Sequence, residues 1–268
     1  MHVLARSRNR LIRKGLIRFF LRRFKIDLSA AEIQDPDAFR TFNDFFTRAL
    51  RAGARTIAAG DNVLVSPVDA TISQLGRLED GAILQAKGKH FDVVNLLGGD
   101  KTRAQAFRDG GFATLYLSPR DYHRIHMPID GTLREMVYVP GRLFSVSPAT
   151  TRALPGLFAR NERVVLLFDT DQGPLALVLV GALFVGSIET VWAGEITPPP
   201  GRRTRSWHYD PKSGPGRIAK GEEIGRFNMG STVIVLTGPD ALRWESLLQP
   251  GQHLALGERI ATAPGRAG

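Results

Sequence analysis

The side chains that could carry chemistry in this chain lie in three short segments far apart in the sequence. Asp69 precedes one run of β-type residues, and Ser231 precedes another. Between them, His123 and His126 are three positions apart. An aspartate, a histidine and a serine suffice for acyl chemistry where they converge, because the carboxylate orients the imidazole, which takes the hydroxyl proton while the oxygen attacks a carbonyl. The fold must therefore bring these segments together.

The carbonyl under attack could belong to a separate substrate or to the chain itself. The residue before Ser231 is Gly230, whose carbonyl no side chain shields, and a cut between them would fall 38 residues before the end (268 − 230). Attack on a substrate would instead make the protein an uncleaved Ser-His-Asp hydrolase acting on a lipid or ester, although the Gly-x-Ser-x-Gly elbow of α/β-hydrolases is absent. In a third, non-enzymatic interpretation, Gly230-Ser231 is only the turn of a β-hairpin in a binding module.

The histidines and the aspartate also allow simpler interpretations. A His-x-x-His pair can bind a metal ion, but it needs a third ligand that no neighbouring His-Glu pattern supplies, so we expect no metal site. Residues three apart in an extended segment point to opposite faces, so His123 and His126 should have different tasks. An aspartate directly before a strand, such as Asp69, is more often a turn former than a catalytic group. The absence of cysteine excludes thiol nucleophiles and disulfides.

The elements that must position these residues are mostly short strands. The 28 glycines and 16 prolines favour many short elements joined by turns. Residues 197–217, rich in proline and glycine, predict a loop. We expect an α+β, mostly β fold, in which an antiparallel β-rich catalytic domain at residues 59–268 follows an α-helical basic arm at residues 1–58. Apolar and β-branched runs predict strands at Val63–Val65, Ala70–Leu75, Ala82–Ala86, Ala113–Leu117, Arg124–Met127, Gly131–Val139, Val164–Asp169, Leu175–Val180, Leu183–Val191 and Thr232–Leu236.

The arm has the charge pattern of a membrane-binding segment. Residues 1–26 hold nine Lys or Arg and no Asp or Glu, within a chain of net charge +10. Apolar residues are interleaved with these charges, so we expect a basic amphipathic helix lying on an anionic membrane. The residues expected to contact that membrane are Arg13, Lys14, Arg18, Phe19 and Arg22.

Other interpretations of the arm stay open. It could be a helix docked on its own domain, or a nucleic-acid binding segment, which a charge confined to one end does not favour. Its apolar runs are shorter than the ~20 residues that span a bilayer, and no small-residue cleavage site follows an apolar core, so we expect neither a membrane span nor a signal peptide. A second helix at Asp37–Leu50 is predicted from the spacing of Phe39, Phe42 and Phe46.

Five segments resemble the signature blocks of the phosphatidylserine decarboxylase family, in the family's order. The most specific of them contains both histidines. The family's processing motif is commonly Leu-Gly-Ser-Thr, and this chain has Met229 in place of the leucine. The five segments are Phe42-Asn43-Asp44-Phe45-Phe46-Thr47-Arg48, Ser66-Pro67-Val68-Asp69-Ala70, Tyr122-His123-Arg124-Ile125-His126-Met127-Pro128, Gly141-Arg142-Leu143-Phe144-Ser145-Val146 and Phe227-Asn228-Met229-Gly230-Ser231-Thr232.

The resemblance implies an enzyme that processes itself. Asp69 orients His126, His126 activates Ser231, and the serine oxygen attacks the Gly230 carbonyl to form an ester. Elimination and hydrolysis then release ammonia and leave a pyruvoyl group at position 231, the only cofactor expected, on a 38-residue chain that stays partnered with the 230-residue chain. His123 is implied as the acid that protonates the carbon from which CO₂ has left.

The resemblance also implies a substrate and a location. The reaction is the decarboxylation of phosphatidylserine to phosphatidylethanolamine. The implied partner is phosphatidylserine in an anionic membrane, with no nucleic acid and with a homodimer left open. The protein is expected on the cytoplasmic face of the inner membrane, as a peripheral protein.

Overall fold

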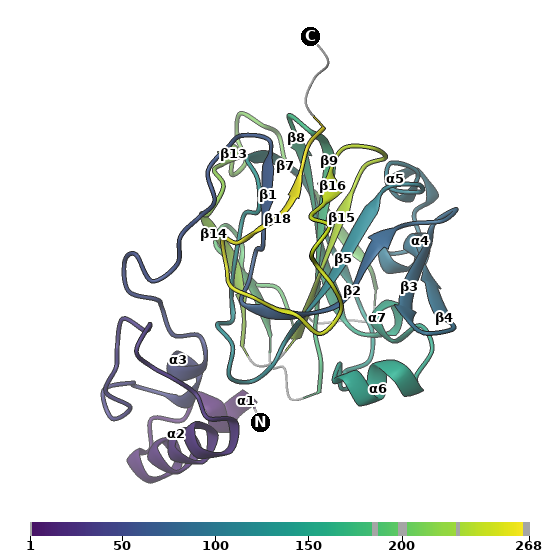
Figure 1. Ribbon diagram of the computed structural model, residues 1–268. Helices are drawn as coiled ribbons and strands as arrows, with labels where there is room; N and C mark the ends of the chain where they lie inside the picture. Colours follow the sequence, from purple (N-terminus) through teal and green to yellow (C-terminus); the bar gives the residue numbers. More distant parts are fainter. Residues whose placement is uncertain (1, 184–186, 198–202, 229–230, 265–268) are drawn as a thin grey trace.

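An antiparallel β body with a helical arm beside it makes up the computed structural model (Figure 1). All the strand pairs among the described residues are antiparallel, which confirms the predicted α+β, mostly β class. The arm contains α1 (His2–Ala5), α2 (Arg10–Phe24) and α3 (Phe42–Phe46). The structure describes residues 2–183, 187–197, 203–228 and 231–264.

Helix α2 forms where the sequence predicts the basic helix. Asn9 caps its first turn, because the side chain accepts hydrogen bonds from the backbone N–H groups of Leu11 and Ile12. The helix ends at Phe24, and the capping residue Lys25 has a left-handed φ of 51° and donates its N–H to the carbonyl of Leu21. Both ends of the helix are thus satisfied locally.

Helix α3 is much shorter than the predicted helix at Asp37–Leu50. Thr41 caps its start by accepting a hydrogen bond from the N–H of Asp44, and the helix ends at Phe46. The expectation of buried phenylalanines is nevertheless correct, because Phe39, Phe42 and Phe46 are all at most 2% exposed. Their partners lie on α2 as well as on α3, so these phenylalanines are buried without the longer helix that their spacing predicted.

The apolar face of α2 packs inside the arm. Ile17 is 1% exposed, and the Phe20 ring lies 4.6 Å from the Phe42 ring between centroids. The predicted amphipathic face is therefore divided: Phe20 contacts α3, whereas Phe19 is 58% exposed. Of the interpretations left open for the arm, a helix docked on its own chain is present in the structure, and part of its apolar surface remains outside.

The largest sheet has nine strands and organises the body. Strand β13 (Arg217–Ile218) also pairs with β7. The other strands run in the order β12 (Arg205–His208), β7 (Gly131–Val139), β8 (Arg163–Thr170), β9 (Gly173–Val180), β15 (Ser231–Thr237), β5 (Gly111–Leu117), β2 (Ala70–Arg77) and β17 (His253–Leu254).

Strand β15 lies in the middle of this sheet and is buried on both faces. It pairs with β5 on one side and with β9 on the other. Val233 and Val235 belong to one core cluster, and Ile234 and Leu236 belong to the cluster on the opposite face. This two-sided burial explains why the strand reads as an unbroken apolar run.

Smaller sheets and helices cover the two faces of the large sheet. One cluster of the core lies toward the smaller sheets, and the other lies toward four short helices and the β3–β4 pair, drawn at the right of Figure 1. The helices are α4 (Val93–Leu96), α5 (Lys101–Gln105), α6 (Pro148–Ala153) and α7 (Leu157–Arg160). The smaller sheets are β11 (Gly194–Glu195), β10 (Ile188–Thr190), β14 (Glu223–Phe227) and β6 (Arg124–His126); β1 (Val63–Val65), β18 (Arg259–Thr262) and β16 (Arg243–Trp244); and β3 (Ala82–Ala86) with β4 (Lys89–Asp92).

Three local predictions about this part of the chain are wrong. Strands β14 and β15 are not a hairpin, since β14 pairs with β6 and β10 in a different sheet. The predicted loop at residues 197–217 contains β12 and the first residue of β13, both paired with β7. Of the predicted strand at Leu183–Val191, only Ile188–Thr190 is a strand among the described residues, and residues 184–186 lie outside them.

Candidate active site

The three sequence segments converge through backbone hydrogen bonds at one end of the large sheet. The N–H of His126 donates to the carbonyl of Pro67, two residues before Asp69, at 2.9 Å. The N–H of Phe227 donates to the carbonyl of His123 at 3.0 Å, and Ser231 follows four residues later. The structure thus brings together the segments that the sequence predicted to meet.

His123 is completely buried and has one free ring nitrogen. Its Nδ1 lies 2.8 Å from the carbonyl oxygen of Asp121. Because a carbonyl only accepts, Nδ1 carries the proton and Nε2 keeps its lone pair. Nε2 is buried without a hydrogen-bond partner among the described residues. Burial lowers the pKa of His123 to about 3, so the ring is neutral at physiological pH.

His126 is held at both ring nitrogens. Nδ1 donates to the carbonyl of Gly221 at 2.7 Å, which leaves the lone pair on Nε2. The hydroxyl of Tyr122 lies 3.0 Å from that Nε2 and donates to it. Burial lowers the pKa of His126. The hydrogen bond to Gly221 and the carboxylate of Glu223 act in the opposite direction, and Asp69 adds a smaller contribution of the same sign. His126 is therefore a neutral base whose lone pair already has a partner.

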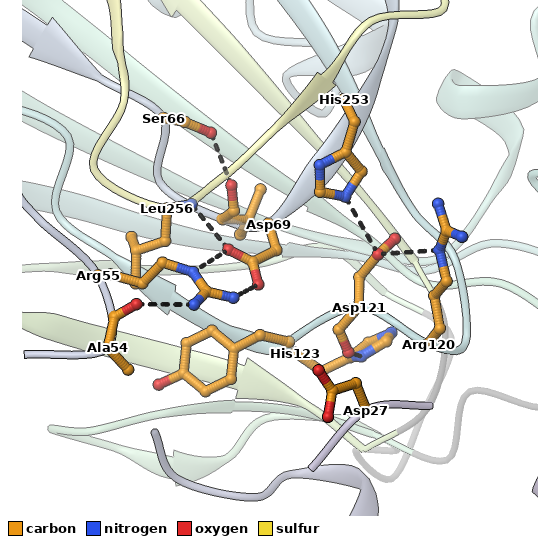
Figure 2. Close-up of polar contacts among 12 residues, drawn as sticks. Asp27, Ala54, Arg55, Ser66, Asp69, Arg120, Asp121, His123, His253 and Leu256 are labelled. Atoms are coloured by element: carbon orange, nitrogen blue, oxygen red, sulfur yellow. Dashed lines mark hydrogen bonds and ion pairs between the residues drawn. The ribbon is translucent and has the colours of Figure 1, made fainter. Parts of the chain in front are cut away.

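Asp69 is paired with an arginine rather than with a histidine. Arg55 donates to it from Nε at 2.9 Å and from Nη2 at 2.5 Å, and the N–H of Leu256 donates at 2.8 Å (Figure 2). The carboxylate is only 7% exposed. The His126 ring is not among its hydrogen-bond donors. The predicted contact between Asp69 and His126 is thus absent from this arrangement, and the catalytic role of the pair stays a prediction.

Ser231 begins the central strand β15. It is fully buried, and its Oγ has no hydrogen-bond partner among the described residues. A buried hydroxyl without a partner is uncommon, and it suits an atom whose partner is a reacting group. Gly230 and Met229 lie outside the described residues, so the predicted cleavage site is described only on its Ser231 side.

The turn between β5 and β6 links the strand end to His123. Asp121 holds this turn, because its Oδ2 accepts from both the N–H and the hydroxyl of Ser118 at 2.7 Å. Leu117, the last residue of β5, is paired with Ser231. Asp121 therefore fixes the tautomer of His123 and also holds the turn that follows β5, the strand beside Ser231.

Helix α3 and its following residues bind the body at this site. Asn43 donates its amide to Oδ1 of Asn228 at 3.0 Å. Arg48, which is 6% exposed, donates from Nη2 to the carbonyl of Arg120 at 2.8 Å, and the Phe46 ring lies 4.1 Å from the His123 ring between centroids. The arm thus supplies part of the wall around His123.

Four of these polar residues were not singled out from the sequence. Arg48, Tyr122 and Asn228 lie inside the blocks that resemble the family, so membership of those blocks was an available signal. Arg55 lies between the arm and the body in no such block. Only the folded arrangement shows that it contacts Asp69.

A cavity of about 340 Å³ lies between the arm and the body beside Asp69. Its walls carry charges of both signs, with Lys25, Arg48, Arg55 and Arg120 as cations. Asp27 and Asp121, both labelled in Figure 2, line it from the arm and from the β5–β6 turn.

A buried serine and two neutral imidazoles in an antiparallel β body define a site for acyl or amine chemistry. Comparison with known proteins gives the family. A family model described as phosphatidylserine decarboxylase matches residues 42–262. The chain therefore belongs to the phosphatidylserine decarboxylase family and is an enzyme of the carboxy-lyase class.

Bacterial relatives match over almost the whole chain. The chain is 52% identical over 261 residues to the phosphatidylserine decarboxylase proenzyme of Stutzerimonas stutzeri, covering 97% of this chain and 88% of that protein. It is 56% identical over 249 residues to the protein of the same name from Photobacterium profundum, covering 92% and 85%. The corresponding protein of Azotobacter vinelandii is 52% identical over 270 residues, covering 98% and 94%.

Proposed function

We propose that this enzyme decarboxylates phosphatidylserine to phosphatidylethanolamine, using a pyruvoyl group that forms from Ser231 when the chain cuts itself between Gly230 and Ser231. The observation that carries the proposal is the buried Ser231 hydroxyl, which has no partner among the described residues and begins the central strand. Relatives named as decarboxylase proenzymes support a processed precursor. A pyruvoyl group formed from Ser231 would occupy the space of the serine itself, so no neighbouring residue would have to move.

In the proposed cleavage, His126 is the base for Ser231. The Gly221 carbonyl holds the Nδ1 proton, which fixes the tautomer with its lone pair on Nε2. For the transfer, Nε2 exchanges the Tyr122 hydroxyl for the serine hydroxyl. The Asp69 carboxylate favours the imidazolium that forms, because it raises the proton affinity of His126 through space. The oxygen of Ser231 then attacks the Gly230 carbonyl, the bond from that carbon to the Ser231 nitrogen breaks as the nitrogen takes the proton from His126, and an ester replaces the peptide bond.

In the proposed turnover, His123 moves one proton. The pyruvoyl group supplies a ketone that takes up the amine of the substrate and an adjacent carbonyl that accepts the electron pair left by CO₂. Because Nδ1 of His123 is held by Asp121, only Nε2 is free to act. Nε2 takes a proton from the incoming ammonium group and returns it to the carbon from which CO₂ has left.

The two chains of the cleaved protein are expected to stay together. The 38-residue chain contains β15, which pairs with β5 over seven positions and with β9 over six. It also contains β16, β17 and β18. Strand β17 pairs with β2, and β18 pairs with β1. A cut before Ser231 removes one peptide bond and none of these pairings.

We also propose that α2 places the enzyme on an anionic membrane at the cytoplasmic face of the cell. No helix in the described part of the chain is both long and apolar enough to cross a bilayer. Leu11 and Phe19 are 83% and 58% exposed, and Arg18 and Arg22 are exposed near them. Such a mixture of exposed apolar and basic groups suits a lipid surface.

Three residues of the proposed membrane set contact Asp37. Lys14 donates to its carboxylate at 2.6 Å, Arg13 donates to its carbonyl at 3.4 Å, and the Arg18 guanidinium lies 3.9 Å from the carboxylate. Their contribution to membrane attraction is therefore expected to be smaller than that of Arg22.

Intact-mass spectrometry of the purified protein tests the proposed function. The wild-type protein should yield chains corresponding to residues 1–230 and 231–268, and reduction with borohydride plus an amine should modify the smaller chain. Ser231→Ala should remain one chain. His123→Asn should be cleaved but should release no CO₂ from carboxyl-labelled phosphatidylserine. An intact wild-type chain that is labelled at Ser231 by a fluorophosphonate would instead support the hydrolase.

A further inference from the structure

We propose that Arg55 is a positioning residue for the self-cleavage, which holds the carboxylate of Asp69 in place beside the histidine segment. The inference rests on the proposed function, in which Asp69 assists His126. It assigns a role to a residue outside every sequence block that resembles the family.

Arg55 grips Asp69 with a two-pronged contact. Nε and Nη2 donate to different carboxylate oxygens, which is the strong, geometrically specific form of this pair. The third nitrogen, Nη1, donates to the carbonyl of Ala54 at 2.8 Å, so the guanidinium itself is anchored. The side chain of Arg55 is only 23% exposed.

The backbone around Arg55 is tied to the C-terminal segment that also contacts Asp69. The N–H of Ala58 donates to the carbonyl of Gly257 at 2.9 Å. The neighbouring Leu256 donates its own N–H to Asp69 Oδ1. Asp69 is thus held from two directions by segments that also hold each other, and one of them belongs to the chain that the proposed cleavage produces.

Arg55 leaves Asp69 able to act on a histidine. An ionised carboxylate has about four acceptor positions. Oδ1 accepts from Arg55 and Leu256, whereas Oδ2 accepts from Arg55 alone. One acceptor position on Oδ2 is therefore not used among the described residues. Arg55 does not compete with a histidine N–H for that position.

Arg55 is also the main counter-charge of Asp69. Arg48 lies within electrostatic range of the same carboxylate, but its Nη2 is bound to the backbone carbonyls of Arg120 and Asp121. Without Arg55, the buried carboxylate would lose its hydrogen-bonded cation and the fork that fixes its orientation. A carboxylate free to turn would no longer be held beside the histidine segment.

The test compares the rate of self-cleavage of full-length Arg55→Met, Arg55→Lys and wild-type precursors under one set of conditions. Precursor is made by a short pulse of cell-free synthesis and followed by intact mass. Because Arg55→Met removes both charge-assisted hydrogen bonds that orient Asp69, its cleavage should slow by about 10-fold or more.

Arg55→Lys keeps the charge and loses the fork, so its cleavage rate should lie between those of Arg55→Met and wild type. It also keeps the inference testable where Arg55→Met does not fold. The matched control is Arg103→Met. Arg103 forms a buried fork with Glu135, at 2.6 and 3.0 Å, and has no hydrogen bond to Asp69, His123, His126 or Ser231. Arg103→Met should lower stability without slowing self-cleavage.

Each outcome has a distinct meaning. An Arg55→Met precursor that cleaves at the wild-type rate would overturn the inference. Faster cleavage would also overturn it, since it would mean that Arg55 keeps Asp69 away from its partner. A loss of rate of the same size in Arg103→Met would likewise overturn it, because general destabilisation would then suffice. A wild-type precursor that is never cleaved would refute the proposed function instead.

Discussion

Acidification should destabilise the uncleaved protein through His123, whose buried ring excludes a proton that the unfolded chain accepts. The ordinary pKa of 6.5 applies to the unfolded chain, and the folded value is about 3. As the pH falls below 6.5, the unfolded state binds the proton first. Stability contributed by the neutral ring is therefore complete above pH 6.5 and is lost progressively toward pH 3.

The size of the loss follows from the difference between those two values. A pH of about 5 is about 1.5 units below the pKa of the unfolded histidine, which is therefore protonated, whereas the folded histidine remains neutral. Each unit is equivalent to about 1.4 kcal/mol, so His123 should cost about 2 kcal/mol of unfolding free energy between about pH 8 and pH 5. That is a large part of the stability of an ordinary domain.

Urea unfolding followed by tryptophan fluorescence measures this loss. The comparison uses Ser231→Ala, to keep one chain, with and without His123→Asn. Asparagine retains a donor for the Asp121 carbonyl but does not titrate. The double variant should lose about 2 kcal/mol less than Ser231→Ala over the same pH interval, because all other titrating groups are common to both. Equal losses in the two proteins would refute the assignment of His123 as a buried neutral ring.

Three further predictions follow from the same contacts. Tyr122→Phe removes the hydroxyl that occupies Nε2 of His126, so self-cleavage should become up to about 5-fold faster, equivalent to one hydrogen bond of about 1 kcal/mol; slower cleavage, timed by intact mass, would contradict this. The two chains of the cleaved protein should elute together under native conditions and separate only in denaturant, whereas early loss of the chain beginning at Ser231 would argue against retention by β15. Phe19→Glu and Arg22→Gln should each weaken binding to vesicles of anionic lipid by about 5-fold or more at unchanged cleavage, since one basic residue near the surface is worth about 1 kcal/mol; unchanged sedimentation with vesicles would exclude α2 as the contact.

Much of the β body was predictable because its strands are marked by local patterns. The bounds of Val63–Val65, Ala82–Ala86 and Gly131–Val139 agree with the prediction at both ends. The strand at Arg205–His208 was not predicted, because its residues are polar and partly exposed and it is a strand only through pairing with β7. Pairing with a distant segment leaves no periodic signal in the shorter partner.

Strand partners were harder to predict than the strands. β14 and β15 follow each other closely and were expected to form a hairpin, yet they belong to different sheets. Sequence proximity favours a hairpin only where nothing competes, and here β5 and β9 cover both edges of β15. The burial of its apolar residues on two faces is the larger contribution to stability, and it decides the pairing.

The sequence by itself determined the family, the fold class and the segments that meet at the site, because each is encoded in residues that are close together in the chain. Only the tertiary structure decided which side chains hold one another. Asp69 is bound by Arg55, and His126 is bound by Tyr122 and Gly221, whereas sequence reasoning paired Asp69 with His126. A buried carboxylate takes the nearest cation that its surroundings present, and that choice depends on distances between elements that no local pattern encodes.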